Sequence, residues 1–243
     1  RVVLLGRDGL RTTAAAERVR AAVPGAQAEA VVCDVSSLAS LAAFTSSWTG
    51  PLDVLVNNAG VMPPSRELTG EGIELTFATN VLGPFVLTDR LSRRLPPGGR
   101  VINVTSGGMY GQRLDGDLQN VDYTPVKAYA RTKRAEVVLT ELWAERLRDQ
   151  GVVVHAMHPG WADTPGVQSS LSRFAKVMRP ILRTPEQGAD TIVWLGAAPE
   201  ALASTGRLWH DRRERPTYLF GLNREPEQSR QALWDTCVEL SAG

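Results

Sequence analysis

Tyr129 and Lys133 are the two residues whose types and spacing point most clearly to chemistry. They stand four positions apart in a segment predicted to be helical, at about 126–149, so they share one helix face. A phenol titrates near 10 and is a poor base at neutral pH unless a cation such as a lysine stabilises its anion. The pair therefore predicts a group that passes a proton to or from an oxygen atom while hydride moves at the carbon. The alternative is a half-buried tyrosine beside a solvated lysine.

Two further polar residues are candidates for the same reaction. Ser106 follows a predicted strand at about 100–105 and precedes two glycines, so its hydroxyl can reach a substrate oxygen unless the segment is an ordinary turn. Asn80 lies inside a helical pattern, where asparagine is a poor helix former, and Gly83-Pro84 just beyond it disrupts the helix. An amide at such a turn can hold a water for proton relay; the alternative is a core asparagine with satisfied hydrogen bonds.

Other segments at predicted strand ends suit a dinucleotide. Asn57-Asn58-Ala59-Gly60 can shape a backbone that lies close to a cofactor, or form a plain turn. Asp34 can bind an adenine amino group. In a dinucleotide site an acidic residue after the second strand grips the ribose 2′-hydroxyl, whereas a nearby arginine accommodates a 2′-phosphate. Gly6 stands where that acid is expected and Arg7 follows it, which favours NADP(H) over NAD(H).

The elements that must position these residues alternate between short apolar runs and longer helical patterns. Strands are predicted at about 1–5, 30–34, 53–57, 100–105, 152–157 and 206–210, and helices at about 10–22, 37–48, 71–95, 126–149, 185–197 and 226–241. Near-continuous apolar strands indicate a parallel sheet buried on both faces. The alternation predicts an α/β fold with a doubly wound, Rossmann-like parallel sheet, in which ligands bind at the carboxyl ends of the strands. We expect one dinucleotide-binding domain over residues 1–243.

The composition narrows the class of protein. The 243 residues are 43% hydrophobic and 22% charged, as in ordinary globular proteins, and a formal net charge of +1 gives no electrostatic footprint for nucleic acid. No apolar run is long enough to span a membrane. The two cysteines and three histidines have no metal-ligand spacing, and isolated cysteines fit a reducing compartment. We therefore expect a cytoplasmic protein without a metal.

Taken together, these segments resemble the short-chain dehydrogenase/reductase family over essentially the whole chain. The resemblance rests on residues in the family's order and near its spacings: Asp34, Asn57 to Gly60, Asn80, Ser106, Tyr129, Lys133, Pro159, Gly160 and Thr164. It implies Tyr129 as the catalytic acid/base, Ser106 as its partner on the substrate oxygen, and Asn80 in the proton relay. It also places Lys133 on the nicotinamide ribose, Pro159 and Gly160 near the nicotinamide, and Thr164 on its carboxamide or the diphosphate.

Within that family the chain looks most like the retinol-dehydrogenase-like branch, because of the long segment between Ser106 and Tyr129 and because of Gly6-Arg7-Asp8. The stretch 158–167, with 187–191 and Gly206-Arg207, resembles the poorly characterised "member twelve" type of dehydrogenase/reductase. The chain departs from the family at its start, where the first strand and the glycine-rich phosphate loop are absent. The 1–34 unit would then have no strand partner on the inner side of the sheet. We expect a strand–loop–helix unit of about 30–45 residues upstream, the alternative being a fragment that binds no cofactor.

The substrate is expected to be a small apolar alcohol or carbonyl compound. Mainly apolar residues are expected to roof the site, unless they are ordinary core residues: Met109, Tyr110, Leu114, Trp161, Val167, Leu171, Phe174 and Met178. The competing functions are a catalytically silent NADP(H)-binding protein and a scaffold with the same fold. The helices at 71–95 and 126–149 are a possible homo-oligomer interface.

Overall fold

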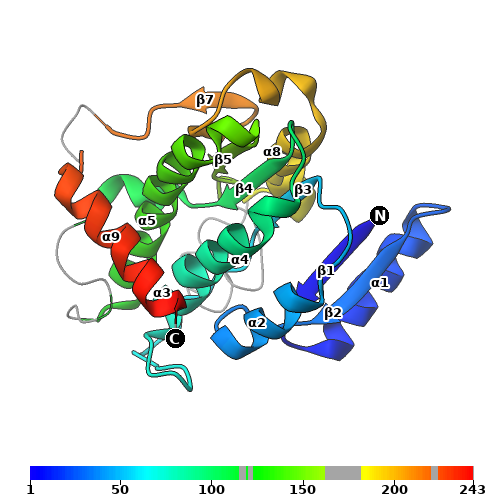
Figure 1. The fold of residues 1–243 in the computed structure, drawn as a ribbon, viewed down its shortest axis with the longest axis horizontal. Helices are drawn as coiled ribbons and strands as arrows, with labels where there is room; N and C mark the ends of the chain where they lie inside the picture. Colours follow the sequence, from blue (N-terminus) through cyan, green and yellow to red (C-terminus); the bar gives the residue numbers. More distant parts are fainter. Residues whose placement is uncertain (115–118, 120–122, 162–181, 220–223, 243) are drawn as a thin grey trace.

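The computed structural model describes residues 1–114, 119, 123–161, 182–219 and 224–242 (Figure 1). The strands are β1 (Val2–Gly6), β2 (Ala28–Val32), β3 (Val54–Asn57), β4 (Arg100–Val104), β5 (Val153–Met157), β6 (Arg207–His210) and β7 (Arg213–Arg215). The helices are α1 (Gly9–Ala22), α2 (Leu38–Ser47), α3 (Leu75–Phe77), α4 (Gly83–Leu91), α5 (Pro125–Arg146), α8 (Pro185–Ala197) and α9 (Glu227–Ser241). This order confirms the predicted alternation of strands and helices.

The strands form two sheets. β1 and β2 pair in parallel with each other, and the larger sheet has the order β3-β4-β5-β6-β7. Its first four strands are parallel, and β7 pairs antiparallel with β6. Figure 1 shows β1 and β2 apart from the larger sheet. Among the described strands, none pairs with the second edge of β1 or of β3, as expected for the 1–34 unit.

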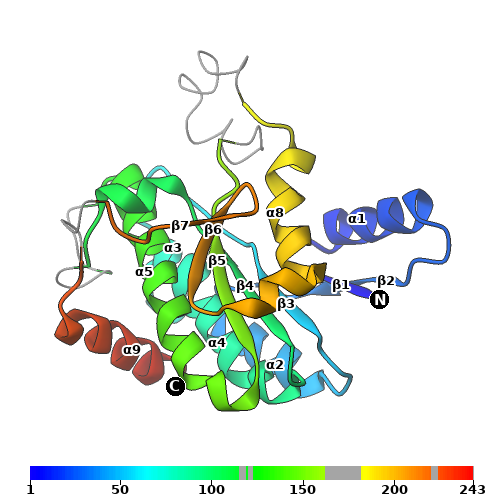
Figure 2. The same cartoon turned by 90° about the horizontal axis from the view of Figure 1, so that it is seen from above.

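The larger sheet is covered on both faces, which makes the fold doubly wound. Successive residues of β4 point to opposite faces: Val101 packs into the cluster that α4 and α5 build, and Ile102 packs into a second cluster with Leu195 of α8. Figure 2 shows α5 and α8 on opposite sides of these strands. Apolar side chains on both faces explain why these strands read as continuous hydrophobic runs.

The helix predicted over 71–95 is instead interrupted. A π-helical turn spans Ala78–Leu82 between α3 and α4, and such turns often occur at functional sites. Pro84 has no N–H to donate to the carbonyl of Asn80, so the regular ladder ends there. A Cβ on Gly83 would lie 2.3 Å from the backbone oxygen of Val35, so only glycine lets this turn pack against the segment after β2. The interruption confirms the disruption expected at Gly83-Pro84, whereas the helical segment as a whole is shorter than the predicted 71–95, from Leu75 to Leu91.

Helix α9 packs over α4 and α5 (Figures 1 and 2). The Trp234 ring lies 5.0 Å from that of Phe85 and 4.7 Å from that of Trp143, centroid to centroid. Part of the helical surface considered for homo-oligomer formation is therefore covered by the chain's own C-terminal helix.

The short strand β7 was not predicted. Its sequence, Arg213 to Arg215, has no apolar alternation, and it follows a turn in which Asp211 and Arg212 have positive φ angles of 53° and 55°. Charged residues are typical of edge strands, where they oppose pairing with other chains. No helix in the described ranges is long and apolar enough to cross a membrane.

Candidate active site

Helix α5 carries the tyrosine–lysine pair. It begins at Pro125, whose fixed φ angle suits the first helical position. The structure brings the two side chains together: Nζ of Lys133 lies 5.5 Å from the centroid of the Tyr129 ring. Tyr129 is half-buried, and the Lys133 side chain is only 3% exposed. The lysine is therefore not a solvated one.

Two oxygen atoms hold the buried ammonium group of Lys133. Its Nζ donates to the carbonyl of Val104, at the end of β4, at 2.9 Å, and to Oε1 of Glu136 at 2.8 Å. Burial alone would lower the pKa of Lys133, but the negative charges of Glu136 and of a Tyr129 anion outweigh it and raise the pKa. The amine therefore stays protonated across the physiological range, as a cation that stabilises a phenolate must.

The end of β4 is tied to the same helix. The hydroxyl of Thr105 donates to the backbone carbonyl of Lys133 at 2.6 Å. The next residue, Ser106, is partly buried, and its Oγ accepts the N–H of Gly108 at 3.4 Å. A Cβ on Gly108 would lie 3.7 Å from Cβ of Ala130, the neighbour of Tyr129. The segment that contains Ser106 thus packs against the part of α5 that contains the tyrosine.

Asn80 is completely buried within the π-helical turn. Its Oδ1 accepts the N–H of Val61 at 2.8 Å, and its Nδ2 donates to the carbonyl of Val61 at 3.2 Å and to Oγ1 of Thr132 at 2.9 Å. Thr132 precedes Lys133 on α5. One amide therefore joins the turn, the loop after β3 and the helix of the tyrosine–lysine pair.

The loop Asn58-Ala59-Gly60 is exposed beside this cluster. A Cβ on Gly60 would lie 3.3 Å from Nζ of Lys133 and 3.6 Å from Oδ1 of Asn80. Glycine at this position keeps space open next to the ammonium group. Of the three N–H bonds of Lys133, two are used within the described chain, so one remains for a ligand. These features fit a ribose hydroxyl at this place.

At the end of β1, Arg7 is exposed and the neighbouring Asp8 accepts the N–H of Arg11 at 3.0 Å as the cap of α1. A Cβ on Gly6 would lie 2.2 Å from Oγ1 of Thr12. No acidic side chain fits at position 6 without a shift of Thr12. At this strand end Arg7 therefore supplies an exposed positive charge, while the exposed Asp8 is engaged in the cap of α1.

Asp34, two residues after β2, is partly buried. Its Oδ1 accepts the backbone N–H of Ser36 at 2.9 Å and the hydroxyl of Ser36 at 2.7 Å. These bonds fix the orientation of the carboxylate at the end of the strand. Its second oxygen, Oδ2, is not used by either bond.

Pro159 and Gly160 follow β5, with Gly160 at a φ of +73°, a region that favours glycine. The preceding His158 stacks on His210, the ring centroids 4.0 Å apart. Burial, with the charge of His210 next, lowers the pKa of His158 to about 4, so this ring is neutral at pH 7. The side chain of Arg183 occupies the space that a Cβ on Gly160 would enter, at 2.8 Å. Thr164 and Val167 lie outside the described residues, as do Leu171, Phe174 and Met178.

Met109 does not lie in the roof of a substrate site, where it was expected. It is completely buried in a cluster with Val137, Ala156 and Leu208. Its sulfur also accepts a hydrogen bond from Arg134 at 3.4 Å. Met109 is therefore a core residue, because the 3-10 turn at Gly107–Gly111 directs it onto α5.

The other residues expected in the roof of the site differ in how far they are buried. Leu114 is also buried in the main core, and the hydroxyl of Tyr110 donates to the carbonyl of Pro216 at 2.8 Å. Trp161 is 49% exposed. Among the described roof residues, Trp161 is thus the one with an exposed side chain.

Sequence reasoning missed Glu136, although a signal was present. Tyr129, Lys133, Glu136 and Thr140 stand at spacings of four, three and four, which is one face of a helix. A carboxylate on the inward face of a buried helix calls for a partner, and the nearby lysine is that partner.

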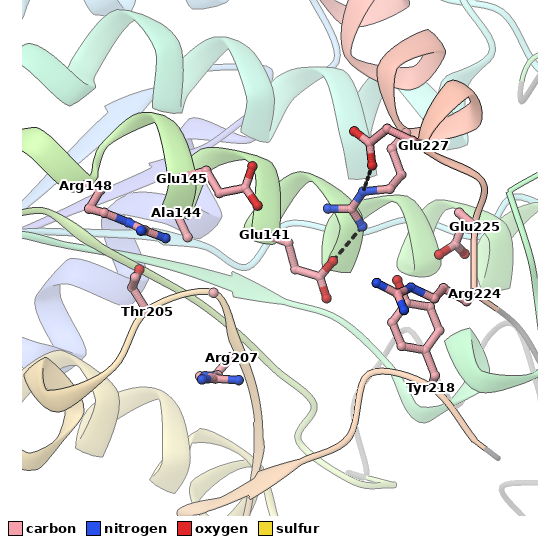
Figure 3. A pocket seen from close by; sticks show the side chains of 12 residues that line it. Glu141, Ala144, Glu145, Arg148, Thr205, Arg207, Tyr218, Arg224, Glu225 and Glu227 are labelled. Carbon is pink, nitrogen blue, oxygen red and sulfur yellow. Dashed lines mark hydrogen bonds and ion pairs between the residues drawn. The ribbon is translucent and has the colours of Figure 1, made fainter. Parts of the chain in front are cut away.

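A separate cavity of about 510 Å³ lies between α5, the start of β6 and the segment that leads into α9. Figure 3 shows its lining, which contains both carboxylates and guanidinium groups. Arg230 bridges Glu141 at 2.6 Å and Glu227 at 3.5 Å there. None of the predicted catalytic residues lines this cavity.

Known proteins resemble this chain both in sequence and in structure. The sequence model described as short chain dehydrogenase matches residues 1–173. The chain is 45% identical to cattle (Bos taurus) dehydrogenase/reductase SDR family member 12 over 174 residues, 69% of this chain and 54% of that protein. It thus spans about half the length of this relative. It is 31% identical to Bos taurus retinol dehydrogenase 12, with 99% of this chain and 78% of that protein covered.

A solved structure agrees. A blue fluorescent protein from a metagenomic library, in complex with NADPH, superposes with a TM-score of 0.68 and 26% identity, over 85% of this chain and 83% of that one. The fold, the positions of the motifs and these matches lead to one conclusion: the chain belongs to the short-chain dehydrogenase family.

Proposed function

We propose that this protein is an NADP(H)-dependent oxidoreductase that transfers hydride between the nicotinamide and a small apolar alcohol or carbonyl compound. The proposal treats residues 1–243 as part of a single dinucleotide-binding domain. The observation that carries it is the buried, protonated Lys133 within 5.5 Å of the Tyr129 ring centroid. A buried cation costs free energy of solvation, and this one makes a nearby phenol a usable acid and base.

Each polar residue of the cluster has a task in that reaction. Tyr129 gives its phenolic proton to the substrate oxygen during reduction and takes it back during oxidation. Ser106 donates a hydrogen bond to the same oxygen and orients it. Lys133 stabilises the phenolate and binds a ribose hydroxyl with its remaining N–H. Asn80 holds the loop and the helix in register, and the carbonyl that Pro84 leaves without an N–H is suited to a relay water.

A nicotinamide cofactor supplies the hydride when it is bound. The residues suited to hold it are Arg7, Asp34, Asn58, Ala59, Gly60, Tyr129, Lys133, Pro159, Gly160 and Thr164. The preference for NADP(H) is supported by Gly6, where an acid would require a shift of the Thr12 side chain, and by the exposed guanidinium of Arg7 beside it. The superposed blue fluorescent protein is described in complex with NADPH, which agrees with this preference.

The apolar substrate is supported by the exposed indole of Trp161 next to Gly160 and by the name of the relative retinol dehydrogenase 12. Val167 is proposed to add to this wall. Met109 is not, since it belongs to the core.

Fluorescence titration of the full-length protein with NADPH and with NADH tests the proposal. We expect saturable binding, tighter for NADPH, and a loss of about tenfold in NADPH affinity in Arg7→Ala, since one charged contact to a phosphate contributes about 1.4 kcal/mol or more. Arg18→Ala, an exposed arginine further along α1, should leave the affinity unchanged. Binding of neither nucleotide would refute the proposal. Tight NADPH binding without turnover of any apolar carbonyl would instead indicate a catalytically silent binding protein.

A further inference from the structure

Glu136 has no role in the proposed reaction, yet it lies within the same cluster. Its side chain is 3% exposed, and its Oε1 accepts a hydrogen bond from Nζ of Lys133 at 2.8 Å. Its second oxygen, Oε2, accepts no hydrogen bond from the described residues. A buried carboxylate oxygen without a hydrogen bond lowers the free energy of unfolding. Glu136 therefore destabilises the folded chain to some extent.

The groups that face Glu136 can be named from each packed element. On α5 these are Lys133 and, beyond it, Tyr129. From the end of β4 comes the hydroxyl of Thr105, which is neutral. The neighbouring Arg134 faces elsewhere, because it forms a buried ion pair with Glu225 at 2.6 Å. Within the described chain, Lys133 is thus the charged group in contact with Glu136.

The buried amides of the sheet continue this polar layer without adding charge. Nδ2 of Asn57 donates to Oδ1 of Asn103 at 2.8 Å, and Nδ2 of Asn103 donates to Thr140 at 2.8 Å. The hydroxyl of Thr140 in turn donates to the backbone carbonyl of Glu136 at 2.7 Å. The helix turn that contains Glu136 is therefore fixed to β3 and β4 by neutral side chains.

We propose that Glu136 is a positioning residue whose carboxylate fixes the Lys133 ammonium beside Val104 and, by gaining or losing a proton, sets the charge that acts on Tyr129. With Glu136 ionised, the pair behind the tyrosine is neutral overall. With Glu136 protonated, the pair carries one positive charge and stabilises the phenolate more strongly. The consequence for turnover rests on the proposed function, whereas the coupling between Glu136 and Lys133 does not.

The pH range of this change is close to neutral. Burial raises the pKa of Glu136 to about 7, because the opposing attraction of Lys133 does not fully offset the loss of water. The carboxyl group therefore exchanges its proton where cellular enzymes work, and the charge next to Tyr129 changes there.

The chain makes a direct measurement possible, because it has three lysines, at positions 127, 133 and 176. In NMR of the full-length protein with ¹³Cε-labelled lysine, residues 1–243 contribute three signals, and Lys133→Arg identifies the one that belongs to Lys133. We expect the Lys133 signal to shift with a midpoint at about pH 7 during a titration from about pH 5 to about pH 9, well below the titration of an amine. Glu136→Gln, which keeps an oxygen acceptor but carries no proton, should abolish that step.

Glu141→Gln is the matched control. Glu141 is on the same helix but pairs with Arg230, so its removal should leave the Lys133 step in place. A wild-type Lys133 signal with no step near pH 7, or the same step in Glu136→Gln, would overturn the proposal. The wild-type titration can overturn it alone, even if the variant fails to fold.

A second readout concerns turnover. The pH profile of kcat/KM should show a limb near pH 7 in the wild type that Glu136→Gln lacks, while NADPH affinity changes by less than about threefold, since the amide still positions Lys133. A retained limb in the variant would contradict the role in catalysis. An NMR step without any turnover would contradict the proposed enzyme function and leave the Glu136–Lys133 coupling intact.

Discussion

The side chain of Asn80 pairs with the backbone of Val61 as a neighbouring strand would: Oδ1 accepts the N–H at 2.8 Å and Nδ2 donates to the carbonyl at 3.2 Å. A third bond, to Thr132, reaches the helix of Lys133. The loop beside the ammonium group, the π-helical turn and α5 thus share one buried amide. The position of Gly60 over Lys133 depends on it.

Replacement of Asn80 is therefore expected to affect stability as well as activity. Asn80→Ala removes three hydrogen bonds, one buried and two part-buried, and leaves the N–H of Val61 without its acceptor, so the free energy of unfolding should fall by about 2–4 kcal/mol. Urea denaturation measures this change. Thr132→Val, which removes only the bond to Asn80 and one local bond, should cost less. Equal losses in the two variants would show that Asn80 does not hold the loop.

Gly83 tests the packing of the interrupted helix. Gly83→Ala would place a Cβ 2.3 Å from the carbonyl oxygen of Val35, a backbone atom that cannot rotate away. We expect a loss of about 1–3 kcal/mol or more in the free energy of unfolding, measured by thermal denaturation. In the control Gly70→Ala the added Cβ meets no atom within 4 Å, so little change is expected. A stable Gly83→Ala variant would contradict the close approach of the π-helical turn to Val35.

The ion pair between Arg134 and Glu225 is expected to matter more than surface pairs. Its side chains are 1% and 0% exposed, and Glu225→Gln would leave a buried guanidinium without its counter-charge. The expected loss is about 3–5 kcal/mol. Glu29→Gln breaks the exposed pair with Arg1, where about 0–1 kcal/mol is expected. Denaturant midpoints of the two variants give the comparison, and similar losses would contradict this ranking.

The pH dependence of the free energy of unfolding is a second test of the protonation of Glu136. Its pKa is raised from 4.5 to about 7 in the folded chain, so the folded state binds the proton more tightly than the unfolded chain does. This contribution to stability is complete below pH 4.5 and is lost as the pH rises through about 7. Glu136→Gln cannot lose it.

The variant should therefore gain about 1–3 kcal/mol relative to the wild type between about pH 5 and about pH 8. Lys133, whose pKa is raised, stays protonated in this window and adds no slope. Denaturation at several pH values tests the sign, and a constant difference would show that Glu136 is ionised throughout.

Much of the sheet could be predicted from the sequence. Val101, Ile102 and Val154 belong to continuous apolar runs, which are typical of strands covered on both faces. Prediction failed where the deciding contact lies far along the chain. Gly83-Pro84 predicted a break in the helix, but the packing of that turn depends on Gly83 meeting Val35, and the strand β7 depends on pairing of Arg213 to Arg215 with β6. Neither contact leaves a periodic pattern.

The candidate site, too, could be predicted from the sequence only in part. Local spacing placed Tyr129 and Lys133 on one face of α5, but it could not show that Asn80 bonds Val61 and Thr132. Met109 was misread because an apolar residue after a strand suits a cavity wall and a core equally well, and only burial separates the two. Glu136 was overlooked because glutamate is usually exposed on helices. Only the structure shows that this one is buried and paired with Lys133.

Rapid-mixing measurement of NADPH oxidation by Tyr129→Phe, with a panel of apolar aldehydes and ketones, tests the central claim most directly. We predict that the full-length variant binds NADPH within about twofold of the wild type while hydride transfer falls by about 10²–10⁴-fold, the usual contribution of a general acid. Tyr218→Phe removes a phenol that packs on Arg134 and should leave the rate unchanged. A Tyr129→Phe protein that transfers hydride at the wild-type rate would contradict the assignment of Tyr129 as the proton donor.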